Sequence, residues 1–338
     1  MRAIAIRRPL PLGDPSCFES VELPEPAPAP RDLLVRVRAV SVNPVDTKVR
    51  RRRDPSTTEP AVLGWDAAGV VEAVGGEVAG FAPGDEVWYA GDVTRPGCDS
   101  ELHLVDERIA AHKPKSLDFE RAAALPLTAI TAWEGLFDRL GIDPEGGDAG
   151  RSILILGGAG GVGSIAIQLA RQVGELQVVA TASRPESQAW CREMGADEVI
   201  DHHRPLSSQL EALGRDGVDF VFCLNDTSGH WPGMCEVVRP QGGICAIVDA
   251  EGPLDLNPLK AKSARFAWEF MFTRPMFGTE DMIEQRLLLE RLARLVDEGE
   301  IVSTHQETLG VLDPRTLAEA HRRIESGRTI GKLVLSVA

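Results

Sequence analysis

The 338-residue sequence predicts an α/β protein in which a β-rich region precedes a doubly wound parallel sheet. Residues 1–115 contain short strand-like runs broken by Pro and Gly, such as DLLVRVRAVSV and GDEVWYA, which are typical of a compact β-rich domain. Between about residues 118 and 265, apolar strand-like runs alternate with helical patterns. That alternation indicates a parallel sheet covered by helices on both faces. The length fits two domains of roughly 100–200 residues each.

The composition excludes several function classes. The chain has 36 basic and 51 acidic residues and a net charge of −15, which disfavours nucleic acid and anionic membrane surfaces as partners. No apolar run approaches the ~20 residues needed to span a bilayer, and the N-terminus has no signal-peptide core. The six cysteines are scattered and form no C-x-x-C pair, so we expect reduced thiols, a cytoplasmic protein and no structural zinc.

The segment ILILGGAGGVGSIAIQLA carries the strongest motif. Gly158, Gly160 and Gly163 fit G-x-G-x-x-G, after a predicted strand and at the start of a predicted helix. In a dinucleotide site these glycines permit a tight turn and close approach of pyrophosphate to the helix N-terminus. A strand–helix turn without a ligand is the alternative. The predicted phosphate-binding residues are Gly158, Ala159, Gly160, Gly161, Val162 and Gly163.

The next predicted strand, LQVVATAS, indicates which cofactor binds. An NAD site usually has an acid about 20 residues after the glycines, bonded to the ribose 2′-OH. Here the strand ends at Ser183 and is followed by Arg184, a pair that suits the 2′-phosphate of NADPH. The alternative is that Arg184 is only the solvated start of a helix. His202 and His203, which follow EVID, either edge the same pocket or are a surface pair.

Taken together, the β-rich N-terminal region, GGAGGVG with AIQLAR, and the C-terminal return resemble the medium-chain dehydrogenase/reductase superfamily. The resemblance spans nearly the whole chain. It implies a discontinuous GroES-like catalytic domain, residues 1–122 and 266–338, and a Rossmann NADP-binding domain, residues 123–265. It also implies a homodimer.

The resemblance further implies that zinc-dependent members carry three catalytic ligands at positions that differ here. Their Gly-His-Glu is Gly64-Trp65-Asp66, their first cysteine is Asn43, and their third ligand is Leu127. Amide, indole and isobutyl side chains do not replace thiolate and imidazole as zinc ligands. We therefore expect no zinc. The alternative interpretation of Trp65 as ordinary core, rather than part of the substrate pocket, stays open.

Finer matches favour one branch. SVNPVDTKVR and FTRPMF are similar to segments of the zinc-free quinone oxidoreductases, the zeta-crystallin-like group. LPLTAITAWEGLFDRLG and VIDHH resemble the subgroup often labelled zinc-type alcohol dehydrogenase-like. The cysteine cluster of a structural zinc is missing, and only Cys98 lies near that region. A tyrosine of the quinone reductases is Lys48 here, which affects the expected acceptor.

The resemblance assigns provisional roles to further residues. Asn43 is a candidate hydrogen-bond donor to a developing oxyanion, and Lys48, Tyr89 or water is the candidate proton donor. The expected substrate pocket contains Trp65, Asp66 and Phe272. The expected cofactor contacts outside the glycine turn are Asp46, Thr131, Ser183, Arg184, His202, Thr273, Arg274 and Lys332. Each residue taken alone is as compatible with a structural role.

The sequence therefore predicts an NADPH-dependent oxidoreductase that transfers hydride to a quinone or an α,β-unsaturated carbonyl without zinc. Such acceptors delocalise the added charge, so positioning by the protein suffices. Two alternatives stay open. One is a zinc alcohol dehydrogenase acting on an alcohol/aldehyde pair. The other is a non-catalytic NADPH-binding redox sensor, or an RNA-binding relative, which the acidic charge disfavours.

Overall fold

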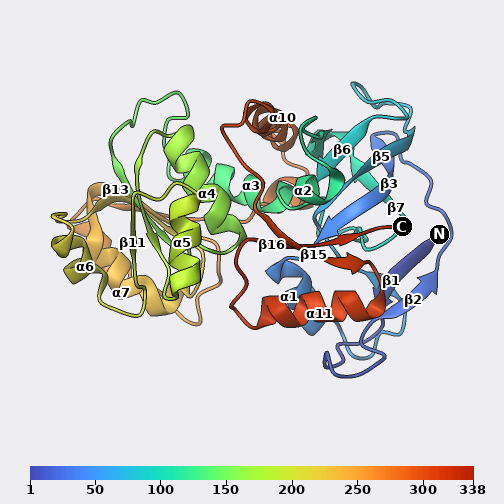
Figure 1. Ribbon diagram of the computed structural model, residues 1–338, viewed down its shortest axis with the longest axis horizontal. Coiled ribbons are helices and arrows are strands. Elements are labelled where there is room, and N and C mark those ends of the chain that lie inside the picture. Colours follow the sequence, from blue (N-terminus) through green and yellow to red (C-terminus); the bar gives the residue numbers. More distant parts are fainter. The chain divides into compact units, whose positions relative to one another are not determined.

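The computed structural model describes residues 1–338, and the chain divides into two compact units (Figure 1). Unit 1 comprises Met1–Leu127 and Phe272–Ala338, and unit 2 comprises Thr128–Met271. Unit 1 is built on mainly antiparallel sheets and unit 2 on a parallel sheet, so the predicted α/β fold class is confirmed. The sequence placed the divisions after residues 122 and 265. The second division falls later because strand β14 (Arg265–Trp268) pairs with the sheet of unit 2.

Unit 1 contains two sheets. Their orders are β2-β1-β4 and β15-β16-β3-β5-β6-β8, with β7 also paired to β3. The strands are β1 (Arg2–Ile6), β2 (Glu19–Glu22), β3 (Asp32–Ser41), β4 (Ala61–Val62), β5 (Ala67–Val74), β6 (Glu86–Tyr89), β7 (Leu102–Asp106), β8 (Ala110–His112), β15 (His305–Val311) and β16 (Lys332–Ser336). The helices are α1 (Pro44–Arg52), η1 (Glu107–Ile109), α2 (Phe119–Ala123), α9 (Thr273–Phe277), α10 (Glu284–Asp297) and α11 (Pro314–Glu325).

The last strand of the chain organises this unit. β16 lies antiparallel to β3, with Val334 opposite Ser41, and its apolar run is buried as the sequence LVL suggests. The Ser41 hydroxyl donates to the Leu333 carbonyl at 2.9 Å, and the Val42 amide donates to the same oxygen at 3.2 Å. This pairing brings residue 332 beside residues 41–43, although 289 residues separate positions 43 and 332 in the sequence.

Unit 2 is a six-stranded parallel sheet in the order β11-β10-β9-β12-β13-β14. Its other strands are β9 (Ser152–Leu156), β10 (Gln177–Thr181), β11 (Glu198–Ile200), β12 (Val218–Cys223) and β13 (Val238–Ala246). Its helices are α4 (Gly161–Gln172), α5 (Pro185–Glu193), α6 (Leu206–Ala212), α7 (Thr227–Val237), α8 (Asn257–Lys260) and the π-helical turn η2 (Glu134–Arg139), while α3 (Pro126–Trp133) begins in unit 1.

Strand β9 is the centre of this sheet. All five of its residues, SILIL, are buried, because helices cover both faces of a doubly wound sheet. The chain leaves β9 toward β10 on one side and returns to β12 on the other. In doubly wound proteins such a reversal marks the crevice, at the carboxyl ends of the two strands, where ligands bind; here those strands are β9 and β12. Across the whole chain, every helix is too short or too polar to span a membrane.

Two histidines of unit 1 are buried without an ionic partner. His321, on α11, is fully buried, packs edge-on against Phe18 at 4.9 Å, and has no hydrogen bond to either ring nitrogen. Burial, with a smaller contribution from Arg50, lowers its pKa to about 3. Burial also lowers the pKa of His103 to about 4. Both imidazoles are therefore neutral in the folded protein at physiological pH.

These histidines predict acid destabilisation. An unfolded histidine has a pKa near 6.5, so below that pH the unfolded chain binds protons that the folded chain excludes. Stability from these groups is present above about pH 6.5 and falls by about 1.4 kcal/mol per pH unit per histidine below it. We expect urea unfolding midpoints to fall between about pH 7.5 and about pH 5.5, and His321→Phe to remove roughly half of that fall.

The exposed His112 provides the control for this measurement. His112→Phe keeps a ring that stacks on Phe81 and removes only an exposed contact with Asp85, so it should change the pH dependence of the unfolding midpoint less than His321→Phe does. A His321→Phe protein with the wild-type pH dependence would show that His321 is not the group responsible.

Candidate active site

The glycine-rich turn lies at the carboxyl end of β9. Gly157 and Gly158 amides donate to the Thr181 hydroxyl and carbonyl, each at 3.0 Å, which ties the turn to β10. A β-carbon at Gly163 would lie 2.4 Å from the Gly157 carbonyl oxygen, so a side chain does not fit there. Helix α4 then begins at Gly161, and the amides of its first turn have no acceptor within the helix. This geometry fits a dinucleotide pyrophosphate.

The structure places Ser183 and Arg184 at the carboxyl end of β10, with no acid at the strand end. Arg184 is the residue that precedes α5, and its guanidinium lies 3.4 Å from the Glu186 carboxylate. The Glu186 side chain is 57% exposed, and exposed ion pairs of this kind contribute little to stability. The hydroxyl of Ser183 and the guanidinium of Arg184, with no acid at the strand end, therefore suit an anionic group on the ribose.

In unit 1, three side chains that the sequence analysis treated separately form one buried cluster. The Lys332 ammonium lies 3.0 Å from Asp66 Oδ2 and also donates to Asn43 Oδ1 and to the Val42 carbonyl. Asn43 Nδ2 donates to Asp66 Oδ2 at 3.1 Å and to the Ser41 carbonyl at 3.2 Å. We call Lys332, Asp66 and Asn43 the lysine cluster; their exposed fractions are 2%, 0% and 1%.

The lysine cluster joins four segments of the chain. Lys332 begins β16, Asp66 directly precedes β5, and Asn43 directly precedes α1. Asp66 Oδ1 accepts the Leu127 amide at 3.1 Å, so the carboxylate also faces the N-terminus of α3. Burial raises the pKa of Asp66, and donation from Lys332, Leu127 and Asn43 opposes that rise.

Two further carboxyl groups are buried nearby. Asp46 Oδ2 accepts the Asn43 amide at 2.7 Å, while its Oδ1 has no partner, and burial raises the pKa of Asp46 to about 7. Asp99 is 2% exposed with an unpartnered Oδ2, and burial raises its pKa well above the usual range. Gly64 is required beside it, because a β-carbon there would lie 2.5 Å from Asp99 Oδ1 and its φ is +93°.

Trp65 is held as a core side chain. It is 3% exposed, and its indole nitrogen donates to the Asp92 carbonyl at 2.9 Å. The Phe272 ring meets it edge-on, with centroids 6.4 Å apart, and Phe272 is 1% exposed. The structure thus brings Trp65 and Phe272 together in a packed rather than an open arrangement, and their place in a substrate pocket stays a prediction.

The residues present do not fit a catalytic zinc ion. The three ligand positions implied by the resemblance hold the Asn43 amide, the Trp65 indole and the Leu127 side chain, none of which coordinates zinc. The Lys332 ammonium pairs with Asp66, the only carboxylate of the lysine cluster. Because the ammonium group is positively charged, it would repel a metal cation at this place. No group of three His, Cys, Asp or Glu side chains in the chain is arranged to hold a metal.

The candidate catalytic residues differ in availability. Tyr89 is fully buried, its hydroxyl lies 3.1 Å from His103 Nδ1, and burial raises its pKa well above the usual value. Both Nδ2 hydrogens of Asn43 are used within the protein, so donation to a substrate oxygen requires one of those bonds to break. Lys48 is partly exposed on α1 and makes no hydrogen bond or ion pair with the chain.

The other predicted cofactor contacts occupy varied environments. Lys332 was expected near a phosphate, but its ammonium group donates to Val42, Asn43 and Asp66. Arg274 pairs with Asp281 at 3.0 Å, and Thr273 begins α9. Thr131 is buried on α3 in unit 2. His202 lies beyond β11, beside His203.

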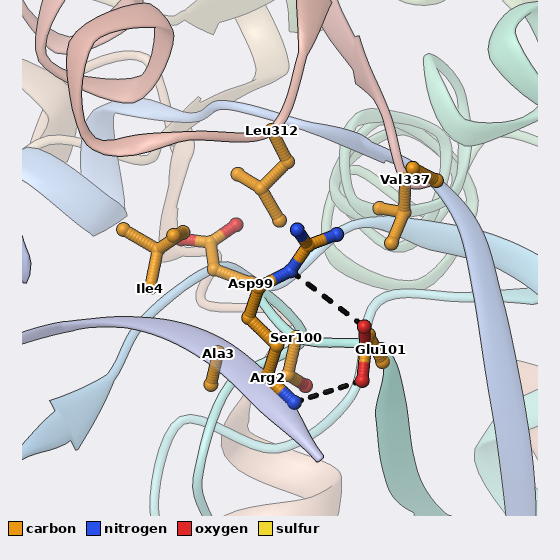
Figure 2. A pocket seen from close by; sticks show the side chains of 9 residues that line it. Arg2, Ala3, Ile4, Asp99, Ser100, Glu101, Leu312 and Val337 are labelled. Atoms are coloured by element: carbon orange, nitrogen blue, oxygen red, sulfur yellow. Dashed lines mark hydrogen bonds and ion pairs between the residues drawn. The ribbon is translucent and has the colours of Figure 1, made fainter. Parts of the chain in front are cut away.

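Sequence reasoning missed Asn225 and Asp99. Asn225 follows β12 at the crevice of unit 2, within 3.4 Å of where a Gly157 β-carbon would stand, and its buried Oδ1 has no partner. Its position two residues after a buried strand was the available signal. Figure 2 shows a pocket of unit 1 that Asp99 lines, where the Arg2 backbone amide donates to Glu101 at 2.8 Å. That pocket contains none of the predicted site residues.

Comparisons with known proteins match two long segments of the chain, the second of which spans parts of both units. Residues 29–113 match the family described as alcohol dehydrogenase GroES-like domain, and residues 194–335 match zinc-binding dehydrogenase. A zinc-type alcohol dehydrogenase-like protein of Staphylococcus epidermidis is 42% identical over 100% of both chains. A quinone oxidoreductase of Pseudomonas aeruginosa is 33% identical over 96% of both. A 2-methylene-furan-3-one reductase of Solanum lycopersicum is 32% identical over 90% of this chain and 71% of that protein.

Solved structures are also similar to this chain over nearly its whole length. A protein of Rhizobium etli CFN 42, provisionally named a zinc-dependent alcohol dehydrogenase, is 50% identical with a TM-score of 0.95, covering 99% of this chain and 98% of that one. A mycobacterial protein, Rv1454c, complexed with NADPH is 25% identical with a TM-score of 0.81, covering 99% of this chain and 100% of that one.

The lysine cluster predicts a distinctive pattern of mutant stabilities. Lys332→Met leaves the Asp66 carboxylate buried without its cation, which should lower the free energy of unfolding by about 3–5 kcal/mol. Adding Asp66→Asn to Lys332→Met removes that buried charge and should recover part of the loss, measured by urea unfolding of each protein. Lys115→Met, at an exposed lysine of the same unit, is the control. Purely additive losses in the double variant would contradict a coupled pair.

Proposed function

Because the chain belongs to the medium-chain dehydrogenase/reductase superfamily, we propose that it is an NADPH-dependent reductase of quinones or α,β-unsaturated carbonyls that works without zinc. The observation that carries this proposal is the lysine cluster, in which Asn43 occupies one of the ligand positions that the resemblance implies and Lys332 pairs with Asp66. The quinone oxidoreductase and furanone reductase among its relatives support the acceptor class. The NADPH complex of a similar structure supports the cofactor.

The proposed acceptor class follows because the polar side chains of the lysine cluster are not free to stabilise a full negative charge on a substrate oxygen. Reduction of a simple carbonyl places a full charge on one oxygen, which a metal or a free hydrogen-bond donor must stabilise. Here the Asn43 amide and the Lys332 ammonium are already engaged by the protein. A quinone or an enone spreads the added charge over a conjugated system. It therefore needs orientation by the protein more than electrostatic activation.

The net reaction requires one hydride and one proton. A bound NADPH would supply the hydride and be left as NADP⁺, and the proton would complete the reduced acceptor. Lys48 is the better placed side-chain proton donor, because it is partly exposed and unpaired, whereas the Tyr89 hydroxyl is buried against His103. Solvent water supplies the proton equally well wherever it reaches the enolate or phenolate oxygen.

Steady-state oxidation of NADPH and NADH tests this function. The acceptors are 1,4-benzoquinone, 9,10-phenanthrenequinone and a small enone, and acetaldehyde serves as the unconjugated control. We expect kcat/KM with NADPH to exceed that with NADH by at least about tenfold, because Arg184 and Ser183 favour a 2′-phosphate. We expect no reduction of acetaldehyde.

The contrary outcomes are distinct. Efficient reduction of acetaldehyde would favour the alcohol dehydrogenase alternative. Preference for NADH would show that the end of β10 has been misassigned. NADPH binding without turnover of any acceptor would favour the redox-sensor alternative.

We also propose a homodimer formed through unit 2. Strand β14 is at the edge of the parallel sheet, so one side of its backbone is open for pairing. Trp268, at the end of this edge strand, is 46% exposed and lies edge-on to Phe266, with centroids 5.0 Å apart. An exposed apolar edge strand suits association with a second copy. Light scattering of the purified chain measures this state, and a monomer at micromolar concentration would contradict it.

The six free, buried cysteines support a reducing cytosol as the compartment.

A further inference from the structure

Unit 2 carries a group of three histidines that the predicted reaction does not use. His202 and His203 follow β11, and His230 lies on the first turns of α7. The ring centroids of His202 and His203 are 4.4 Å apart, and those of His202 and His230 are 6.1 Å apart. We call these three residues the histidine cluster. Residues 28 positions apart in the sequence thus form one imidazole-rich patch.

The histidine cluster lies next to the end of the strand that carries Ser183 and Arg184. Strands β10 and β11 are parallel neighbours, with Thr181 opposite Ile200. Ser183 and His202 each lie two residues beyond this pair, so both emerge at the same edge of the sheet. This is the edge at which the ribose end of a dinucleotide binds in doubly wound sheets.

The surroundings favour the neutral form of two of these imidazoles in the free protein. Burial and the neighbouring histidines lower the pKa of His202, whereas Asp201 opposes that shift. Burial also lowers the pKa of His230, opposed by Asp226. The Nδ1 atom of His202 is buried and has no hydrogen-bond partner in the chain. An anion placed against the cluster would favour the protonated form of each ring.

The other charged groups at this edge do not satisfy the cluster. Arg184 pairs with Glu186, and Arg204 lies exposed on the loop before α6. Asp201 accepts the His203 backbone amide at 2.9 Å, and Asp226 accepts the Gly229 amide at 2.9 Å. Both nearby carboxylates are thus engaged by backbone amides at the ends of their own segments.

We propose that the histidine cluster completes the 2′-phosphate site begun by Ser183 and Arg184, and that NADPH binding is coupled to proton uptake by these rings. The proposal rests on the NADPH preference proposed above. NADH has no 2′-phosphate, so its binding lacks this coupling. By thermodynamic linkage, lowering the pH strengthens NADPH binding as much as NADPH strengthens proton binding. The cluster therefore makes cofactor discrimination depend on pH.

Titration calorimetry of the full chain tests the coupling. Dissociation constants of NADPH and NADH are measured between about pH 8.5 and about pH 6.5, above the second pKa of a phosphate monoester near 6. Each measurement is repeated in two buffers of different ionisation enthalpy, which gives the number of protons taken up. We expect the Kd for NADPH to fall about three- to tenfold over this range while the Kd for NADH stays constant.

Variants identify the groups responsible. The double variant His202→Gln, His230→Gln should bind NADPH with a Kd that depends less on pH than in wild type and with smaller net proton uptake. His112→Gln, at an exposed histidine of unit 1, should behave as wild type.

Two contrary outcomes are distinguishable. If NADPH is preferred but its Kd and proton uptake are the same in wild type and the double variant, the histidine cluster is not part of the site, and the proposed function stands. If NADH binds as tightly as NADPH at every pH, the cofactor assignment itself fails.

Discussion

The buried ion pair between Lys332 and Asp66 is the constraint on which the catalytic unit depends. A charge that is 2% exposed is tolerated only with a partner, so the start of β16 and the segment before β5 must stay together. Asn43 and the Leu127 amide fill the remaining hydrogen-bonding positions of the same carboxylate. The Asp66 carboxylate thereby links the segments of Asn43 and Leu127, two of the three positions at which the resemblance implies metal ligands in zinc-dependent members.

The two units differ in the polar groups that they offer to a substrate or a cofactor. The lysine cluster uses its polar groups on one another, so unit 1 contributes shape and orientation rather than a strong electrophile. Unit 2 presents free amides at α4 and cationic or protonatable groups at the end of β10 and beyond β11, which suit an anionic dinucleotide. These two sets of groups are consistent with the proposed conjugated acceptor and phosphorylated cofactor.

Much of this was accessible from the sequence because it depends on local patterns. The buried run SILIL, the glycines after it and the helix that follows correspond to β9, the turn and α4. The substitutions at Asn43, Trp65 and Leu127 already argued against zinc. The partner of Asp66 could not be predicted, because Lys332 and Asp66 are 266 residues apart in the sequence and only the pairing of the strands brings them together. His230 and Asn225 were missed for the same reason, since only the packed strand ends bring them to their neighbours.

The zinc content of the purified, active protein tests the central claim most directly. Mass spectrometric metal analysis is combined with NADPH-dependent quinone reduction before and after exhaustive treatment with a chelator. The account predicts far less than one zinc per chain and an unchanged rate, because an ammonium group rather than a metal links the segments at Asp66. One zinc per chain whose removal abolishes the activity, and whose return restores it, would contradict the account.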